Sequence, residues 1–224
     1  VARALAERMG AKLRSIPAVM DQEIINIEID VVGLVFHVYN KSLPLIIHRF
    51  VERLAYLDRA YLFAVTTYGD SPGLTIQHLA DLVEARGMHL AAGFGIHMPY
   101  NYLTPTLTLR GFFKAFTLRE IPAEKQQTLI AQAPDKIAEI AAYVSARKSG
   151  DFDITSDPLT RLADRFHLPD TLAKPIWLKV AGVDDAPDVS FLESRQWMDH
   201  AFYADERCIA CGTCADVCPV ENIH

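Results

Sequence analysis

Four cysteines near one end of the chain carry the clearest chemistry in the sequence. Cys208, Cys211, Cys214 and Cys218 follow the spacing C-x₂-C-x₂-C-x₃-C, Pro219 comes next, and the 224 residues contain no other cysteine. Three thiolates at three-residue steps on a tight loop can surround one set of corners of an iron–sulfur cubane. The spacing therefore predicts that these four cysteines are iron–sulfur ligands. In the two-cluster pattern the first three bind one [4Fe–4S] cluster and the fourth ligates a second, so the cluster that Cys218 serves stays open.

The residues between the cysteines fit this prediction, and two alternatives stay open. Gly212 and Thr213 are small, so backbone N–H groups can approach the cluster sulfurs. Zinc is one alternative, although zinc ribbons usually use two C-x₂-C pairs separated by a longer segment. A disulfide or a chance pattern is the other. Cysteines crowded into one terminus cannot staple a chain this long, which favours a reducing compartment.

Composition places the chain among globular proteins with a buried core. Half of the residues are apolar and 22% are charged, which is typical of one or two folded domains. No apolar run approaches the roughly 20 residues of a membrane helix. No charged and then apolar leader with a cleavage site is present, so we expect a cytoplasmic protein without a membrane span.

Charge is distributed unevenly along the chain. Residues 1–150 carry 16 Lys and Arg against 14 Asp and Glu, whereas residues 151–224 carry 6 against 14, which gives the net charge of −6. An acidic C-terminal part argues against nucleic acid, whose phosphates need a basic face. It is compatible with a basic redox partner protein, and equally with a purely solubilising surface.

The elements that must position any site alternate along residues 1–150. Apolar, β-branched runs predict buried strands at 29–36, 59–69 and 88–98, the first of them buried on both faces, and a short edge strand at 11–16. Apolar residues at helical spacing predict helices at 1–10, 45–57, 72–87 and 123–150, the last of which contains Pro134. Alternating strands and helices predict an α/β fold, with a parallel sheet covered on both faces.

Ligands of such sheets bind beyond the carboxyl ends of the strands, so the loops that follow the strands are informative. These loops, at 37–44, 66–73 and 97–105, combine Gly and Pro with hydroxyl and amide side chains. They also carry four tyrosines, which are costly to leave bare at loop tips: Tyr39, Tyr68, Tyr100 and Tyr102. The pattern favours a flat aromatic ligand, and the alternative is that the tyrosines pack on one another or on the C-terminal part.

Three stretches carry a resemblance to a known family. They read VGLVFHVYNKSLPLIIHRFVERL, YLFAVTTYGDSPG and GFGIHMPYNYL. With the cysteine motif, they resemble the fused flavodoxin–ferredoxin electron-transfer proteins of anaerobic bacteria and archaea. The resemblance implies a flavodoxin-like, doubly wound parallel sheet at 1–150 and a small ferredoxin-type domain at 200–224. It does not cover residues 151–199, which their own pattern predicts to be a bridge with short helices at 159–166 and 190–205. It implies FMN beside two loops, with these residues in contact: Val38, Tyr39, Asn40, Thr66, Thr67, Tyr68, Gly69, Asp70 and Gly73.

The sequence departs from the family at three places. The stretch from His37 to Lys41 is more polar than the corresponding family loop and lacks Gly. The first strand of a flavodoxin-like sheet and its phosphate-binding loop do not precede the helix at 1–10. A second cysteine motif does not follow Cys218, so one or two clusters remain open. We therefore expect a fragment clipped at both ends, which alone would lack the FMN phosphate site and would bind FMN weakly or not at all.

The function expected from this combination is electron transfer between FMN and one or two [4Fe–4S] clusters, with other redox proteins as partners. One alternative is a flavin-dependent oxidoreductase that the clusters supply with electrons and that acts on a small molecule. Another is a non-redox scaffold stapled by zinc. Among established catalytic signatures, neither a nucleophile elbow nor a phosphate-binding loop of the Walker type occurs in the sequence. Whether the chain is itself an enzyme stays open.

Overall fold

The structure is a computed structural model, and it falls into two compact units. The first unit comprises Val1–Arg14 and Gln22–Ser156, and the second comprises Ser15–Asp21 and Asp157–His224. The structure describes residues 1–39, 42–55, 57, 60–69, 71–99, 121–153, 158–166, 171, 174–180, 190–194 and 203–216.

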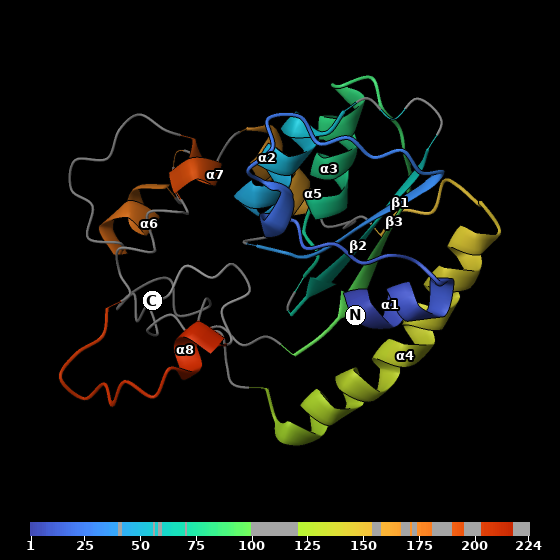
Figure 1. The fold of residues 1–224 in the computed structure, drawn as a ribbon. Coiled ribbons are helices and arrows are strands. Elements are labelled where there is room, and N and C mark those ends of the chain that lie inside the picture. Colours follow the sequence, from blue (N-terminus) through green and yellow to red (C-terminus); the bar gives the residue numbers. More distant parts are fainter. Residues whose placement is uncertain are drawn as a thin grey trace. The chain divides into compact units, whose positions relative to one another are not determined.

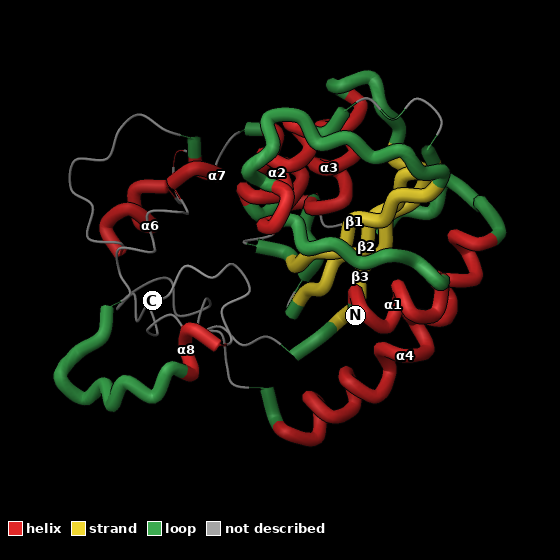
Figure 2. The backbone as a smooth tube through the Cα atoms, in the orientation of Figure 1, coloured by secondary structure: helices red, strands yellow, loops and turns green. Residues whose placement is uncertain are grey.

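A parallel sheet forms the centre of the first unit. Its strands are β1 (Val31–His37), β2 (Tyr61–Tyr68) and β3 (Leu90–His97), in the order β1-β2-β3 (Figures 1 and 2). All three strands were predicted within two residues of their observed bounds, because each is a continuous apolar run of the kind that a doubly covered sheet buries. The α/β class with parallel strands is therefore confirmed.

Helices cover both faces of this sheet. Two pack on one face, namely α2 (Leu45–Arg53) and α3 (Thr75–Glu84), and two pack on the other, namely α1 (Ala2–Met9) and α4 (Ala123–Ser145) (Figure 1). The second face has a continuous buried core made by Leu5, Phe63, Val65, Ala92, Phe94, Ile96, Ala133, Ile137, Ile140, Ala141 and Val144. The helical periodicity of the sequence predicted all four helices because apolar residues three and four positions apart form one stripe.

β1 corrects one expectation about burial. Val32, Leu34 and Phe36 are buried, whereas Gly33 and His37 on the alternate positions are exposed. The strand is therefore buried on one face only, not on both as its composition predicts. The reason is its place at the edge of the sheet, where the core under α1 and α4 reaches only Val31 and Val35, and these only in part.

The two edges of the sheet differ. Residues 150–153 run beside β3, where Gly93 donates its N–H to the Asp151 carbonyl (3.0 Å) and the Asp153 N–H donates to the Gly93 carbonyl (2.8 Å). This pairing could not be predicted from the sequence, because the stretch is acidic and rich in turn residues. Within the described part of the chain, no strand pairs with the outer edge of β1.

Glycines set two helix boundaries. Gly10 has φ 62° and ends α1, as predicted, because a left-handed residue satisfies the last carbonyls of a helix. Gly73 has φ 57°, so the chain cannot be helical there. For this reason α3 begins at Thr75 and not at Pro72, where the sequence suggested a start. α4 continues through Pro134 without interruption.

The described residues of the second unit form short helices with few buried apolar side chains. They are α5 (Pro158–Arg165), α6 (Lys174–Val180), α7 (Phe191–Ser194) and α8 (Thr213–Asp216), with a 3₁₀ turn at Pro17–Val19. α5 was predicted. The helix predicted at 190–205 is helical at 191–194 and not helical at 203–205, and the positions between lie outside the described residues.

The edge strand predicted at 11–16 is wrong. These residues are largely exposed and irregular, and the turn begins at Ile16, which takes a right-handed helical conformation before Pro17. An apolar residue at every second or third position is not enough for a strand when no neighbouring strand supplies hydrogen bonds. Among the described residues, the helices also lack the combination of length and apolarity that a membrane crossing requires.

Candidate iron–sulfur site and the carboxyl edge of the sheet

The cysteine segment begins with a tight turn. The Cys208 N–H donates to the Asp205 carbonyl (3.0 Å), while the Asp205 carboxylate accepts from the backbone N–H of Arg207 (3.0 Å) and pairs with its guanidinium group. Arg207, by side-chain and backbone hydrogen bonds, holds the pKa of Asp205 below its usual range. Within the turn, the ionised Asp205 carboxylate is therefore paired with Arg207, and Cys208 lies at the start of an open loop.

Two residues in the left-handed region flank Cys211. Ala210 has φ 50° and Gly212 has φ 77°. The second is easy for glycine, and the first is uncommon for a residue with a Cβ atom. After them the chain enters α8, where Ala215 and Asp216 donate their N–H groups to the Gly212 carbonyl (3.0 and 3.1 Å). The loop thus changes direction on both sides of one cysteine, as a segment that wraps around a compact ligand must.

The described thiols are free and lie apart from one another. Cys208, Cys211 and Cys214 are exposed and unbonded to one another, and Cys218 lies outside the described residues. In the described part of the chain, no three His, Cys, Asp or Glu side chains are close enough to hold a metal ion. This is expected for thiol ligands, because thiolates repel one another and metal binding and local folding are coupled. The donor set and loop length fit a cluster, which would itself gather the sulfurs.

Cys211 has a chemical environment of its own. Its Sγ lies 3.3 Å from Oγ1 of Thr213. The Thr213 hydroxyl, followed by the Thr213 backbone N–H, holds the pKa of the Cys211 thiol below its usual range. Because the thiolate is the form that ligates metals, this environment favours ligation at Cys211.

The carboxyl ends of the strands hold the residues expected beside FMN. The Val38 N–H donates to the Thr67 carbonyl (2.8 Å), and Tyr39 and Ser42 exchange backbone hydrogen bonds (3.0 and 3.1 Å) that close the loop after β1. The Ser42 hydroxyl lies 2.8 Å from Nδ1 of His78 on α3. These contacts bring the loop after β1 against the end of β2 and against α3. Asn40 and Asp70 lie outside the described residues.

The end of β2 divides its residues between the core and the surface. Thr66 is fully buried, and its hydroxyl donates to the Phe94 carbonyl (3.3 Å), so this side chain serves the sheet. Thr67, Tyr68 and Gly69 are half-buried. Gly73 is buried in the turn that leads into α3.

Two residues that sequence reasoning missed lie beside Tyr68. The ring of His97 stacks on the Tyr68 ring, with centroids 5.1 Å apart and planes 6° from parallel, and its Nε2 donates to the Gly69 carbonyl (2.9 Å). The Asp153 carboxylate accepts the Gly95 N–H (2.8 Å). Partial burial, and then the Asp153 charge, raise the pKa of Tyr68. Because His97 lies at the end of a predicted strand, its place near Tyr68 could have been predicted. Nothing in the sequence indicated that Asp153 would lie there.

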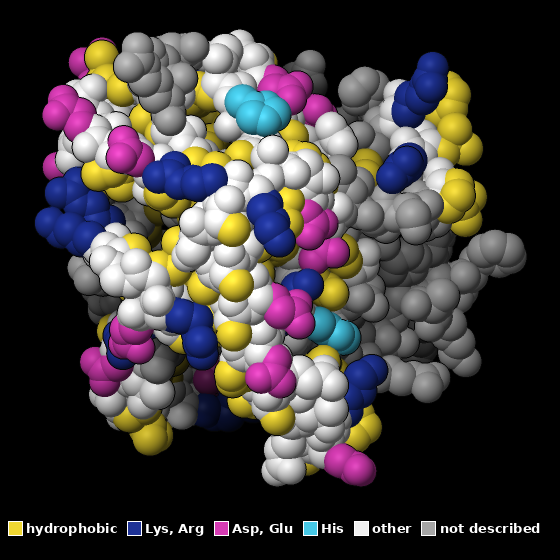
Figure 3. Space-filling view, turned by 90° about the vertical axis from the view of Figure 1, so that its right-hand side faces the viewer, with side chains coloured by type: hydrophobic (Ala, Val, Ile, Leu, Met, Phe, Trp, Pro, Cys, Tyr) yellow, Lys and Arg dark blue, Asp and Glu magenta, His cyan; other side chains and the backbone are white. Residues whose placement is uncertain are grey.

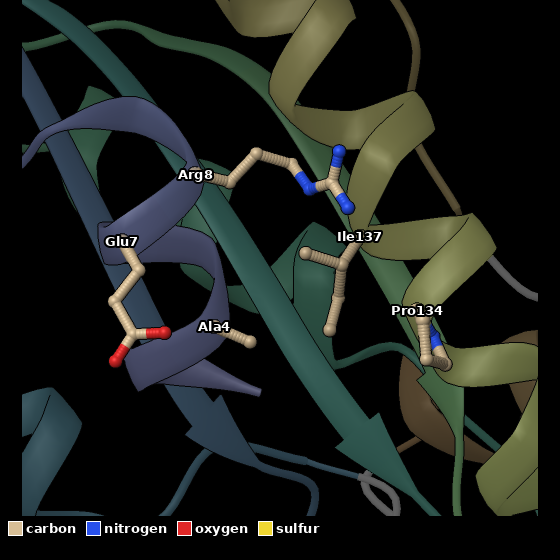
Figure 4. Close-up of a pocket in the computed structure, with 5 residues that line it drawn as sticks. All are labelled: Ala4, Glu7, Arg8, Pro134 and Ile137. Carbon is tan, nitrogen blue, oxygen red and sulfur yellow. The ribbon is translucent and has the colours of Figure 1, made fainter.

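A separate groove lies between α1 and α4. It is lined by Ala4, Glu7, Arg8, Pro134 and Ile137. The Arg8 side chain reaches toward α4, Ala4 and Ile137 point into the gap, and Glu7 points away (Figure 4). On the surface seen from this side, Lys and Arg side chains are interspersed with Asp and Glu (Figure 3). The groove presents one cation beside apolar side chains, which is helix packing rather than a catalytic constellation.

One comparison with known proteins gives a match. The family model described as a 4Fe-4S binding domain matches residues 202–224, which include all four cysteines. No match was found among curated proteins or among solved structures. The C-terminal segment is therefore similar to ferredoxin-type iron–sulfur domains, and this similarity supports metal binding and electron transport.

Proposed function

We propose that this protein transfers electrons through one or two [4Fe–4S] clusters whose ligands include Cys208, Cys211, Cys214 and Cys218, and that it couples this iron–sulfur centre to FMN bound at the carboxyl edge of the sheet. The observation that carries the proposal is the C-x₂-C-x₂-C-x₃-C spacing inside the segment matched by the 4Fe-4S family model. When bound, the cluster exchanges single electrons and the flavin one or two, so the pair joins the two kinds of chemistry.

The described residues can contribute to flavin binding in a specific way. Tyr39 and Tyr68 are half-buried aromatic side chains on neighbouring loops, and each ring already contacts a histidine ring, His37 and His97. Stacking on such rings is how a flat, apolar ligand is held while its polar edge faces backbone groups. We assign the ring system of FMN, and not its phosphate, to these two aromatic side chains.

The partner of this electron transfer is proposed to be another redox protein in a reducing compartment such as the cytoplasm. The three described thiols are free, as such a compartment requires. The segment 151–224 carries 6 basic against 14 acidic residues. A basic surface on the partner would be attracted to it, and the attraction would weaken with added salt.

The flavin part is tested by titration of the anaerobically prepared protein with FMN, followed by quenching of flavin fluorescence. We expect weak but saturable binding that Tyr68→Leu weakens further by at least about fivefold, since stacked aromatic contacts contribute about 1–3 kcal/mol to such ligands. Tyr203→Leu is the matched control, because Tyr203 is 85% exposed and lies in the second unit. Equal binding by both variants, or no saturation in the unaltered protein, would remove FMN from the proposal and leave the cluster.

A further inference from the structure

The contact between Thr213 and Cys211 singles out one cysteine of the motif. The Cys211 sulfur lies 3.3 Å from the Thr213 hydroxyl oxygen, within the range of a hydrogen bond to sulfur. The two residues are separated by Gly212 alone, whose left-handed conformation folds the chain back so that side chains two positions apart can meet. In the described part of the chain, no other hydroxyl group contacts a cysteine sulfur.

Ligation fixes the direction of this hydrogen bond. A cysteine that binds iron does so as a thiolate, which has no proton to donate. The Thr213 hydroxyl must then be the donor and the Cys211 sulfur the acceptor. Substitution at position 213 can therefore remove this side-chain hydrogen bond without removing a cysteine.

A donated hydrogen bond stabilises negative charge on sulfur, and the amount of that charge differs between the oxidation states of an iron–sulfur cluster. The reduced state carries one more electron, which is shared with the ligand sulfurs. A donor at Cys211 therefore stabilises the reduced state more than the oxidised one, and hydrogen bonds to sulfur are among the determinants of cluster potential.

We propose that Thr213 is a positioning residue whose hydroxyl group, by donating to the Cys211 sulfur, raises the reduction potential of the cluster. This inference rests on the proposed iron–sulfur function. Thr213 is exposed and lies at the first position of α8. Because its side chain is exposed, substitution removes little packing, and its role can be tested in this way.

The test compares Thr213→Val, which has nearly the same shape but no hydroxyl, with Thr213→Ser, which keeps the hydroxyl. Each protein is loaded with iron and sulfide under anaerobic conditions, and its cluster content and reduction potential on an electrode are measured. For Thr213→Val we expect a lower potential. At a fixed electrode potential the ratio of reduced to oxidised protein should fall about threefold, which is about 28 mV for a one-electron couple. Thr213→Ser should remain close to the unaltered protein.

The outcomes separate this inference from the function on which it rests. An unaltered protein without iron and sulfide contradicts the proposed function. Full cluster content with the same potential in both variants contradicts the role of Thr213 and leaves the function standing. Loss of the cluster from Thr213→Val alone would support an action of the hydroxyl on Cys211. Loss from both variants would overturn it, because the hydroxyl would then not be the property that matters.

Discussion

The two units of this protein are organised by different forces. In the first unit, Val51, Leu54, Val65, Leu79 and Val144 are completely buried between the sheet and its helices. In the second unit, large apolar side chains are exposed, among them Leu159 (75%), Tyr203 (85%) and Ile209 (84%). Apolar burial of the first kind stabilises a fold without help, whereas the second unit shows few such contacts among its described residues.

This difference indicates where the second unit obtains its order. Its cysteine segment is built from hydrogen bonds between near neighbours, such as those of Asp205 with Arg207 and of Gly212 with α8. Small ferredoxin-like and zinc-binding segments gain much of their folding free energy from the metal that their thiolates hold. We therefore expect the bound iron–sulfur cluster to stabilise the second unit, and apolar packing to stabilise the first.

The largest expected effect is the loss of the cluster when one of its cysteine ligands is replaced. Cys211→Ser should abolish the visible absorption of the reconstituted cluster, because an alcohol replaces the thiolate. The circular dichroism of the sheet and its helices should remain. Ile209→Ala is the matched control, since Ile209 lies in the same loop and its side chain is exposed. If Cys211→Ser unfolded the whole protein, seen as loss of helical circular dichroism, the first unit would not be stabilised by its apolar packing alone.

The second comparison uses two isoleucines of α4. Ile140 is 1% exposed and belongs to the core under α1 and α4, whereas Ile130 is 55% exposed. Ile140→Ala should lower the free energy of unfolding by about 2–5 kcal/mol. Ile130→Ala should change it by less than about 0.5 kcal/mol. Urea unfolding followed at the helical signal gives both values, and similar losses in the two variants would mean that this core does not hold the first unit together.

A smaller effect is expected where α3 meets the sheet. A Cβ atom on Gly93 would lie 2.3 Å from Cγ2 of Ile76, close to the stem of that side chain, where it cannot easily move aside. Gly93→Ala should therefore cost about 1–3 kcal/mol by overpacking. Combining it with Ile76→Ala should cost less than the sum of the two single changes, because the second removes the clash. Strict additivity in urea unfolding would show that a Cβ atom at position 93 does not clash with Ile76.

The smallest effect concerns pH. Burial and Asp153 raise the pKa of Tyr68, so folding favours the neutral phenol. This contribution to stability is fully present below the usual tyrosine pKa of about 10 and is lost as the pH rises through the raised value. Tyr68→Phe should therefore flatten the fall in unfolding temperature above about pH 10. Tyr203→Phe, at an exposed position, should leave the fall unchanged, and identical profiles for the two variants would contradict the assignment.

Sequence periodicity predicted the three strands and the four helices of the first unit because each buries a repeating apolar pattern. It did not predict the pairing of residues 150–153 with β3, because that segment contributes backbone hydrogen bonds and an acidic side chain and has no apolar repeat. It also placed a strand at 11–16, where no partner strand stabilises one. The local pattern of apolar residues predicts which elements are buried, but it does not predict which distant segments pair.

The candidate site shows the same limit. Cysteine spacing alone predicted the four ligands, because their chemistry lies in residue type and interval. The left-handed conformation of Ala210 and the bond from Thr213 to Cys211 could not be predicted, since they depend on how the loop turns. His97 and Asp153 reach Tyr68 only through the register of the sheet and the return of the chain after α4. The flavin contacts expected at the loops remain a prediction.

The most direct test of the central claim is the content of iron, inorganic sulfide and zinc in protein prepared without oxygen. We expect iron and sulfide in equal amounts, in multiples of four per chain, with negligible zinc. Substitution of Cys208, Cys211 or Cys214 by serine should lower iron and sulfide together. Zinc bound without sulfide, and removed by the same substitutions, would contradict an electron-transfer cluster and show a zinc-stapled segment instead.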